Sequence, residues 1–329
     1  MRLLVTGATG FIGARLAVLA RDAGHEVVAT GAINNPAERE RSESLARSGI
    51  EVVVGSLLAH ELPPVVTRGC DGIVHLAAAQ HEAHLGDEHF WRVNVEGTTR
   101  LLQAAADSGV RRFVYGSTIG IYGGCTGARL DEASPIDPRN VYTHTKLQAE
   151  AVVRGCERIP ESTVMRIAET YGPGDLRLLK LFRAIKRGRF LMIGTGHNRH
   201  ALVHVDDVAR GLLLGVTRAE AAGETFVLAA GDDLTTHEMV TAIAAAVGRV
   251  VPRLRSPFWP FLVAATAGEK LLKPLGLRPP LSRRSLDFFD KSFVLSIDKA
   301  ATRLGYAPHQ RFVASAGSTA HWYEAQGLI

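Results

Sequence analysis

Short apolar runs recur along the first half of the chain, and amphipathic stretches separate them. The clearest runs are Leu3–Val5, Val27–Ala29, Val52–Val54, Ile73–Leu76, Phe113–Tyr115 and Val164–Ile167. Strands that are apolar at nearly every position are buried on both faces, which is typical of a parallel sheet covered by helices. The pattern therefore predicts an α/β protein.

Apolar residues at helical spacing lie between these runs. They predict one helix from about Ile12 to Ala23 and another from about Val93 to Ser108, each followed by a glycine that can end it. A third helix is expected to carry Tyr142 and Lys146. The alternation of strand and helix predicts a Rossmann-type doubly wound parallel sheet.

The second half of the chain has a less regular pattern, with glycine and proline residues between shorter elements. We expect residues 1–167 to form a dinucleotide-binding Rossmann domain and residues 168–329 to form mainly a smaller C-terminal substrate-binding lobe. The segment of about residues 200–230 is regular enough to return to the main sheet. Within it, the Asp206-Asp207 pair is interpreted as a helix N-cap rather than as catalytic carboxylates.

The composition is that of a soluble globular protein, with 329 residues, 46% hydrophobic and 22% charged. The formal charge of +5 suits an anionic ligand such as a dinucleotide. The basic residues are scattered and are not interleaved with aromatic residues, so nucleic-acid binding is not expected. The first residues run straight into a glycine-rich turn and leave no room for a secretory signal, so we expect a cytoplasmic protein.

Some cysteine and histidine residues are interpreted as structural. Three cysteines, none of them in a CxxC pair, are expected to be free thiols: Cys70, Cys125 and Cys156. Three histidines lie close together without a convincing third ligand set, so no metal is expected: His81, His84 and His89.

The most apolar late segment runs from Phe258 to Gly268. It is well short of the ~20 residues needed to span a bilayer, so no integral membrane segment is expected. We expect it to face an apolar ligand or to lie at a subunit interface. A group of aromatic residues either walls an apolar substrate pocket or packs in the core: Phe258, Trp259, Phe261, Phe288 and Phe289.

Gly7, Gly10 and Gly13 follow the first predicted strand and open the first predicted helix. At such a turn, backbone N–H groups and the positive end of the helix can hold a pyrophosphate. A glycine triad alone is weak evidence, because glycines also serve tight turns. Its position between a strand and an amphipathic helix makes it a dinucleotide-binding signal.

The end of the second predicted strand bears on the choice of cofactor. A carboxylate there would accept hydrogen bonds from the ribose of NAD, whereas its absence makes room for the extra phosphate of NADP. Residues 30–35 contain no carboxylate, and Arg39 and Arg41 follow shortly afterwards. The alternative reading of these arginines is a solvated helix start. The sequence therefore favours NADP(H), with NAD(H) as the alternative.

Tyr142 and Lys146 form a Tyr-x-x-x-Lys motif that begins twenty-four residues after Thr118. A phenol normally loses its proton near pH ~10. A tyrosine can therefore exchange protons with a substrate hydroxyl at neutral pH only if a nearby cation favours the phenolate. Lys146, one helical turn beyond Tyr142, is placed to be that cation. Thr118 would hydrogen-bond the same substrate oxygen, and Ser117 is the alternative hydroxyl.

Taken together, these residues resemble the extended short-chain dehydrogenase/reductase family, also called the NAD-dependent epimerase/dehydratase family. The resemblance covers nearly the whole chain. Other segments that carry it are His75-Leu-Ala-Ala78, Asn94-Val-Glu-Gly-Thr98, Ile121-Tyr-Gly123, Arg166 with Tyr171-Gly-Pro-Gly174, and His204-Val-Asp-Asp207. The C-terminal part looks like the 3β-hydroxysteroid dehydrogenase and related ketone-reductase branch, through Pro279 to Arg284, Lys299-Ala300 and Leu304 to Pro308.

The resemblance implies roles for individual residues. Thr118, Tyr142 and Lys146 would be catalytic, with Tyr142 as the acid/base, and Asn94 would brace the active site. The expected cofactor contacts are Gly7, Thr9, Gly10, Phe11, Ile12, Gly13, Ala32, Ser56, Leu57, Leu76, Ala77, Ala78, Asn94, Tyr142, Lys146, Ile167 and Glu169. The expected substrate contacts are Gln80, Thr118, Arg199 and His200.

Some positions depart from the family pattern. Members specific for NAD often have an aspartate where Gly31 stands, and an aspartate commonly near the adenine is Ser56 here. Sugar-nucleotide epimerases usually carry Arg-Asp shortly before the histidine that corresponds to His204, and this chain lacks that pair, although Arg199 is a candidate substitute. The mismatch weakens a nucleotide-sugar function.

The sequence therefore predicts an NAD(P)-dependent oxidoreductase that transfers a hydride between nicotinamide and a secondary alcohol or ketone of a bulky small molecule. A nucleotide-sugar epimerase or dehydratase with tightly bound NAD is the alternative. A non-catalytic NAD(P)-sensing protein is a second alternative, which Thr118, Tyr142 and Lys146 argue against. The resemblance also implies a homodimer formed through helices that flank the active site.

Overall fold

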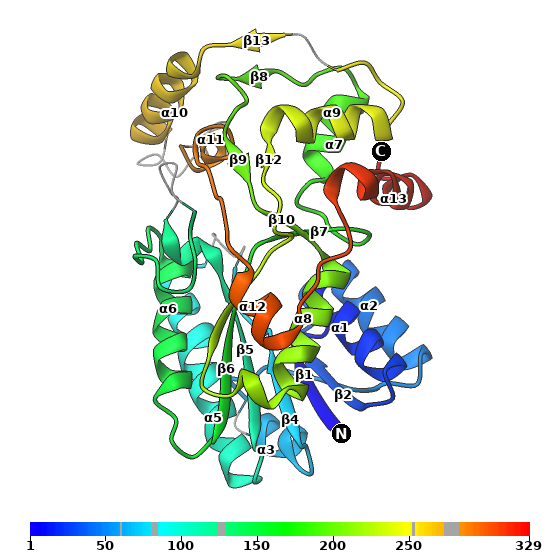
Figure 1. The fold of residues 1–329 in the computed structure, drawn as a ribbon, viewed down its shortest axis with the longest axis vertical. Coiled ribbons are helices and arrows are strands. Elements are labelled where there is room, and N and C mark those ends of the chain that lie inside the picture. The colour runs from blue at the N-terminus through cyan, green and yellow to red at the C-terminus, as the bar shows by residue number, and fades with distance from the viewer. Residues whose placement is uncertain (60, 81–84, 124–128, 252–253, 273–282) are drawn as a thin grey trace.

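The computed structural model of the chain describes residues 1–59, 61–80, 85–123, 129–251, 254–272 and 283–329. Its main feature is a seven-stranded parallel sheet (Figure 1). In spatial order the strands are β11 (Thr225–Leu228), β6 (Glu161–Ile167), β5 (Arg112–Thr118), β4 (Gly72–His75), β1 (Arg2–Thr6), β2 (Glu26–Gly31) and β3 (Glu51–Val54). The chain order reverses between β1 and β4, which is the point where doubly wound sheets bind ligands. The predicted Rossmann-type α/β fold is confirmed.

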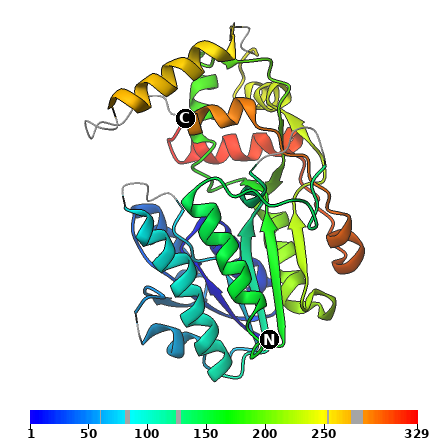
Figure 2. The same ribbon diagram turned by 90° about the vertical axis from the view of Figure 1, so that its left-hand side faces the viewer.

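Helices cover both faces of this sheet (Figures 1 and 2). One face packs against α1 (Phe11–Asp22), α2 (Pro36–Arg47), α8 (Val205–Thr217) and α12 (Asp298–Leu304). The other face packs against α3 (Leu62–Thr67), α5 (Gly97–Asp107) and α6 (Val141–Arg154). Burial on both faces explains why the strands read as continuous apolar runs.

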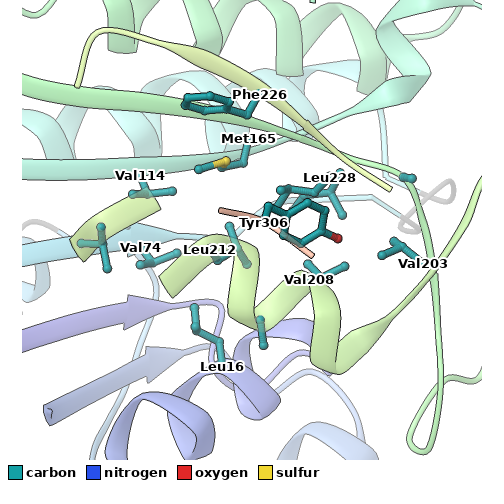
Figure 3. Close-up of a cluster of buried hydrophobic side chains, with 14 of the residues drawn as sticks. Leu16, Val74, Val114, Met165, Val203, Val208, Leu212, Phe226, Leu228 and Tyr306 are labelled. Carbon is teal, nitrogen blue, oxygen red and sulfur yellow. The ribbon is translucent and has the colours of Figure 1, made fainter. Parts of the chain in front are cut away.

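The larger apolar core lies on the α1 and α8 face (Figure 3). Val74, Val114 and Met165 from three neighbouring strands point into it and meet Leu212 from α8. The helix approaches closely at Gly215, where a Cβ would lie 2.3 Å from the Met165 methyl carbon and would displace that side chain. The core therefore holds α8 tightly against the strands that lead to the carboxyl edge.

A smaller lobe lies beyond the carboxyl edge of the sheet (Figure 1). Its helices are α7 (Leu179–Lys186), α9 (Thr236–Ala246), α10 (Phe258–Leu272), α11 (Arg283–Asp290) and α13 (Phe312–Ala325). Short strand pairs join β10 (Leu202–His204) to β7 (Glu169–Tyr171), β12 (Leu234–Thr235) to β9 (Arg199–His200), and β13 (Arg255–Ser256) to β8 (Met192–Ile193). The chain passes between sheet and lobe more than once. Strands β7 to β10 come first in the sequence, and α8, β11 and α12, which follow them, pack on the main sheet again.

The helix predicted from Val93 to Ser108 begins differently from the expectation. Residues Asp87–Trp91 form α4 and Arg92–Glu96 form a π-helical turn, η1, so α5 starts only at Gly97. Such turns inside helices often occur at functional sites. Here the turn contains the buried Asn94.

The N-cap predicted at Asp206 and Asp207 is wrong. The N-cap of α8 is His204, whose Nδ1 accepts the Asp206 backbone N–H at 3.2 Å. The two carboxylates are used elsewhere: Asp206 binds Arg15, and Asp207 binds Arg210 together with backbone N–H groups of residues 309 and 310. A histidine nitrogen can cap as an oxygen does, and residue preferences alone favour aspartate.

Candidate functional site

The turn between β1 and α1 presents backbone rather than side chains. Gly7 has a φ of 66°, and a Cβ on it would lie 2.7 Å from backbone atoms of Leu76 and Ala77. A Cβ on Gly13 would lie 2.3 Å from the Gly7 oxygen. The N-cap of α1, Gly10, makes no side-chain cap, and the first turn contains no acidic residue. The first N–H groups of α1 and its positive end can therefore hold an anion.

A cavity of about 680 Å³ opens at the carboxyl edge of the sheet, next to this turn. It brings together residues from the glycine turn, from the ends of β5 and β6, from α6 and from the smaller lobe. The predicted site residues that line it are Gly7, Gly10, Phe11, Ile12, Gly13, Leu76, Ala78, Gln80, Thr118, Tyr142, Lys146, Ile167, Glu169 and His200. The three predicted catalytic residues therefore share one cavity with the glycine turn.

The start of α6 fixes the position of Tyr142. Asn140 is the N-cap and accepts the Thr143 N–H at 3.0 Å, while the Thr143 hydroxyl accepts the Asn140 N–H at 3.2 Å. This capping box sets the helix start, so Tyr142 lies in the first turn and Lys146 one turn later. Thr118 ends β5, where its Oγ1 accepts the Gly120 N–H at 3.1 Å.

Lys146 is buried beneath the cavity wall. Its Nζ donates to the Gly116 carbonyl oxygen at 2.5 Å and lies 4.1 Å from the centroid of the Tyr115 ring. Burial lowers the pKa of Lys146 to about 7, although the Glu150 carboxylate acts to raise it. The charge of this lysine near neutral pH therefore depends on the groups around it.

Glu150, one turn beyond Lys146, is fully buried. Its oxygens accept hydrogen bonds from Arg166 at 3.0 and 3.2 Å and from Arg154 at 2.6 Å. The Ser117 hydroxyl also donates to it, at 2.5 Å. Buried charges require such compensation. Because the Ser117 proton is used in this network, the geometry favours Thr118 over Ser117 as the hydroxyl that serves a substrate.

Some of the predicted site residues do not line the cavity: Thr9, Ala32, Ser56, Leu57, Ala77, Asn94 and Arg199. Thr9 donates to the Ala32 carbonyl oxygen at 2.8 Å, which ties the glycine turn to the end of β2. Asn94 is buried and hydrogen-bonds both the Ala79 backbone and the Thr145 hydroxyl, so it joins the segment after β4 to α6. Arg199 lies 3.8 Å from the Asp233 carboxylate.

Near the end of β2, the structure shows a carboxylate that the sequence analysis missed. Arg41 lines the cavity, and its guanidinium donates to the carbonyl oxygens of Thr9 at 3.3 Å and Gly174 at 3.1 Å. Glu38 lines the same cavity and accepts the Asn34 N–H at 2.6 Å. Arg41 was expected near the cofactor phosphate, whereas Glu38 lies beyond residues 30–35, where a carboxylate was expected if NAD is the cofactor; the i, i+3 spacing of Glu38 and Arg41 on α2 was the available signal.

The wall on the side of the smaller lobe combines polar and aromatic groups. The His200 ring lies 4.7 Å from the Phe288 ring, between centroids, and its Nε2 is 2.9 Å from the Thr236 hydroxyl. Its Nδ1 lies 3.7 Å from the Glu169 carboxylate. Burial acts to raise the pKa of Glu169, but the contact with His200 and the charge of Arg177 lower it overall. Glu169 is therefore an anion that faces the cavity at neutral pH.

Several lining residues of this wall carried no signal in the sequence. They include charged and aromatic residues from distant segments: Arg139, Asp175, Arg177, Asp287, Lys291 and Phe293. The predicted aromatic group is divided. Phe288 lines the cavity, Phe258, Phe261 and Phe289 pack beside Ile193 and Leu286, and Trp259 is exposed.

In the part of the chain that the structure describes, no group of three or more potential metal ligands occurs, and none of the helices is long and apolar enough to cross a bilayer. Cys70 and Cys156 are free thiols. His81, His84, Cys125 and Pro279–Ser282 lie outside the described residues.

Comparison with known proteins gives concordant matches. The model of the NAD dependent epimerase/dehydratase family matches residues 3–229. A 4-hydroxy-2-methyl-3-oxo-4-farnesyl-3,4-dihydroquinoline-1-oxide ketoreductase from Stigmatella aurantiaca is 30% identical, over 93% of this chain and 92% of its own. A 3-beta-hydroxysteroid dehydrogenase from Mycolicibacterium neoaurum is 29% identical, over 93% and 87%. A crystal structure of a dTDP-glucose 4,6-dehydratase variant from Streptomyces venezuelae with NAD bound is 28% identical and superposes over the whole of both chains with a TM-score of 0.78.

Proposed function

Because this chain belongs to the NAD-dependent epimerase/dehydratase family of extended short-chain dehydrogenases/reductases, and is therefore an enzyme that binds a nicotinamide cofactor, we propose that it is an NADP(H)-preferring oxidoreductase. Its substrate is a secondary alcohol or ketone on a bulky, largely apolar molecule. The observation that carries this proposal is the cavity in which Thr118, Tyr142 and Lys146 lie beside the glycine turn.

The residues of the cavity can move a proton to or from the substrate oxygen. The nicotinamide supplies or accepts the hydride when the cofactor is bound. Tyr142 gives its hydroxyl proton to the carbonyl oxygen during reduction and takes it back during oxidation. The Thr118 hydroxyl donates to the same oxygen and stabilises its developing charge. Protonated Lys146 favours the phenolate of Tyr142, and Glu150 helps to keep that lysine charged.

The glycine turn fits a dinucleotide for reasons of space and charge. Side chains at Gly7 or Gly13 would collide with backbone, so the pyrophosphate can approach the N–H groups at the start of α1. At the other end, Gly31 leaves no carboxylate on β2, and a Cβ there would lie 2.5 Å from the Thr9 hydroxyl. The guanidinium of Arg41 is the cationic group for the additional phosphate of NADP(H), because its bonds to the carbonyl oxygens of Thr9 and Gly174 use only two of its five N–H groups.

The residues of the wall on the side of the smaller lobe, here called the substrate wall, fit a largely apolar ketone that makes hydrogen bonds at one place. Phe288 and Phe293 supply aromatic surface, and the Glu169 and His200 pair supplies hydrogen-bonding groups. The sequence placed Glu169 among the cofactor contacts; its pairing with His200 supports the proposal that it serves the substrate instead. Three basic side chains of the lining away from the glycine turn already have carboxylate neighbours: Arg139 with Asp137, Arg177 with Asp175, and Lys291 with Asp287. Paired in this way, they are poor partners for the diphosphate of a nucleotide sugar. The names of the ketoreductase and steroid dehydrogenase relatives agree with an apolar substrate.

The experiment is a titration of the purified protein with NADPH and NADH, followed by turnover with a panel of bulky ketones and a panel of nucleotide sugars. We expect the protein to bind added NADPH more tightly than NADH and to oxidise it when ketones are present. A protein that is purified with tightly held NAD and converts nucleotide sugars without net cofactor consumption would instead be an epimerase or dehydratase.

A further inference from the structure

Apart from Thr266, Glu269 and Lys270, helix α10 consists of apolar residues and glycine, yet it lies at the outside of the smaller lobe (Figures 1 and 2). Trp259, Val263 and Leu271 are 67%, 60% and 69% exposed, and their spacing places them on one face. On the opposite side the helix buries Ala265 and packs beside Leu286 of α11. A helix that is apolar all round is normally buried, so the outer face of α10 lacks its natural surroundings in the isolated chain.

Exposed apolar residues are frequent in the sequence segment that contains this helix. Among the described residues, thirteen large apolar side chains are exposed, and five of them fall within residues 250–271. These five are Val250, Leu254, Trp259, Val263 and Leu271. The concentration distinguishes this surface from the scattered apolar residues that all soluble proteins expose.

The same stretch of sequence has a strongly positive net charge. Residues 249–284 contain eight Lys and Arg and one acidic residue, Glu269, which is a local charge of +7 in a chain with a formal net charge of +5. The rest of the chain therefore carries −2. Within the described residues, Lys270 of α10, Arg255 of β13 and Arg249 are exposed. Apolar surface flanked by cations is complementary to an anionic lipid surface.

We propose that α10 and the residues around it bind the surface of an anionic lipid bilayer, with the helix in the plane of the interface. A helix of 15 residues is about 22 Å long, which is too short to span the ~30 Å hydrocarbon core. An exposed tryptophan and cationic neighbours suit the headgroup region. A second copy of the chain is a poorer occupant, because a symmetric contact through this face would bring the exposed cations Arg255 and Lys270 of the two copies close together.

The position of α10 would place the bilayer beside the substrate wall. Helix α11 packs against α10 and carries Asp287 and Phe288, which line the cavity. This benefit rests on the proposed function, since only an apolar substrate would reach the cavity from lipid. Binding itself needs no turnover and is measured separately.

The test is flotation of the full-length protein with vesicles of phosphatidylcholine alone or mixed with phosphatidylglycerol. We expect binding to the anionic vesicles, weakened by added salt, and a blue shift of tryptophan emission. The triple substitution Trp259→Ser/Val263→Ser/Leu271→Ser should weaken vesicle partition at least ~30-fold through lost apolar burial. The matched control is Val54→Ser/Val65→Ser/Val313→Ser, which removes exposed apolar groups elsewhere and should leave partition unchanged.

The proposal is overturned if the wild type does not bind anionic vesicles or if the α10 variant binds them as well as the wild type does. It is also overturned if the α10 substitutions only convert a dimer into monomers, because α10 would then be a contact between copies. Turnover of a water-soluble ketone should be equal in the wild type and in both triple variants. Absence of ketone turnover in all three would contradict the proposed function and leave the vesicle result unaffected.

Discussion

The two walls of the cavity are built in different ways. The cofactor wall consists mainly of backbone: the glycine turn after β1, the ends of β5 and β6, and the first turn of α6. The substrate wall consists of side chains from separate segments, including His200 of β9 and Phe288 of α11. Backbone geometry tolerates little change, whereas side chains can be exchanged on the same scaffold. We therefore propose that residues of the cofactor wall carry out the reaction and that residues of the substrate wall select the substrate.

The largest effect is expected on the first wall, at Tyr142. Tyr142→Phe removes the acid/base hydroxyl and should lower turnover ~10³-fold while leaving cofactor affinity nearly unchanged. Steady-state kinetics and NADPH titration measure the two quantities. Tyr115→Phe is the matched control, because the hydroxyl of this buried tyrosine has no hydrogen-bond partner among the described residues and the ring below Lys146 is kept. Similar losses in both variants would mean that Tyr142 acts through the structure and not through its proton.

The next effect tests whether the cofactor wall depends on backbone alone. Gly13→Ala places a Cβ 2.3 Å from the Gly7 oxygen, so the turn must shift, and we expect cofactor affinity to fall ~100-fold. Gly24→Ala is the control, since its Cβ would meet nothing within 4 Å although its φ is 85°. That variant should lose about 1 kcal/mol of stability and keep its cofactor affinity. Unchanged NADPH binding in Gly13→Ala would contradict a backbone cradle.

The buried lysine of the first wall gives a prediction for stability against pH. Burial lowers the pKa of Lys146 from 10.5 to about 7, so the unfolded chain holds this proton more tightly than the folded protein does. The cost of burying the lysine is then greatest below pH 7 and shrinks as the pH rises towards 10. Lys146→Met should therefore be stabilised relative to wild type, and its gain in the free energy of unfolding should be larger at pH 6 than at pH 9 by roughly 2.5 kcal/mol. Urea unfolding at both values measures it, and a difference independent of pH would refute the lowered pKa.

The smallest effect should sharpen the comparison by touching only the second wall. Glu169→Gln removes the anion beside His200 and should raise the KM for ketone substrates ~10-fold, with turnover and NADPH affinity changed much less. Glu324→Gln is the control, a surface carboxylate paired with Lys186. If NADPH affinity falls as much as ketone affinity, Glu169 belongs to the cofactor wall and the division of the cavity is wrong.

Local sequence patterns were sufficient to predict the elements and residues that form the cofactor wall. The six apolar runs predicted from the sequence are strands of the sheet, and the glycine turn and Tyr142 with Lys146 line the cavity. The choice between Ser117 and Thr118 was not decidable from the sequence, because both hydroxyls follow the same strand and only the contact with Glu150 distinguishes them. The homodimer and the cytoplasmic location stay predictions.

The sequence by itself determined the family, the strand and helix order and the residues of the proton-transfer motif, because these depend on periodicity and spacing within short segments. Only the tertiary structure decided that His200 stacks on Phe288 beside Glu169, that His204 caps α8, and that α10 faces outward. Each of these depends on how segments far apart in the chain pack, and local periodicity shows which face of a helix or strand is apolar without showing what covers it.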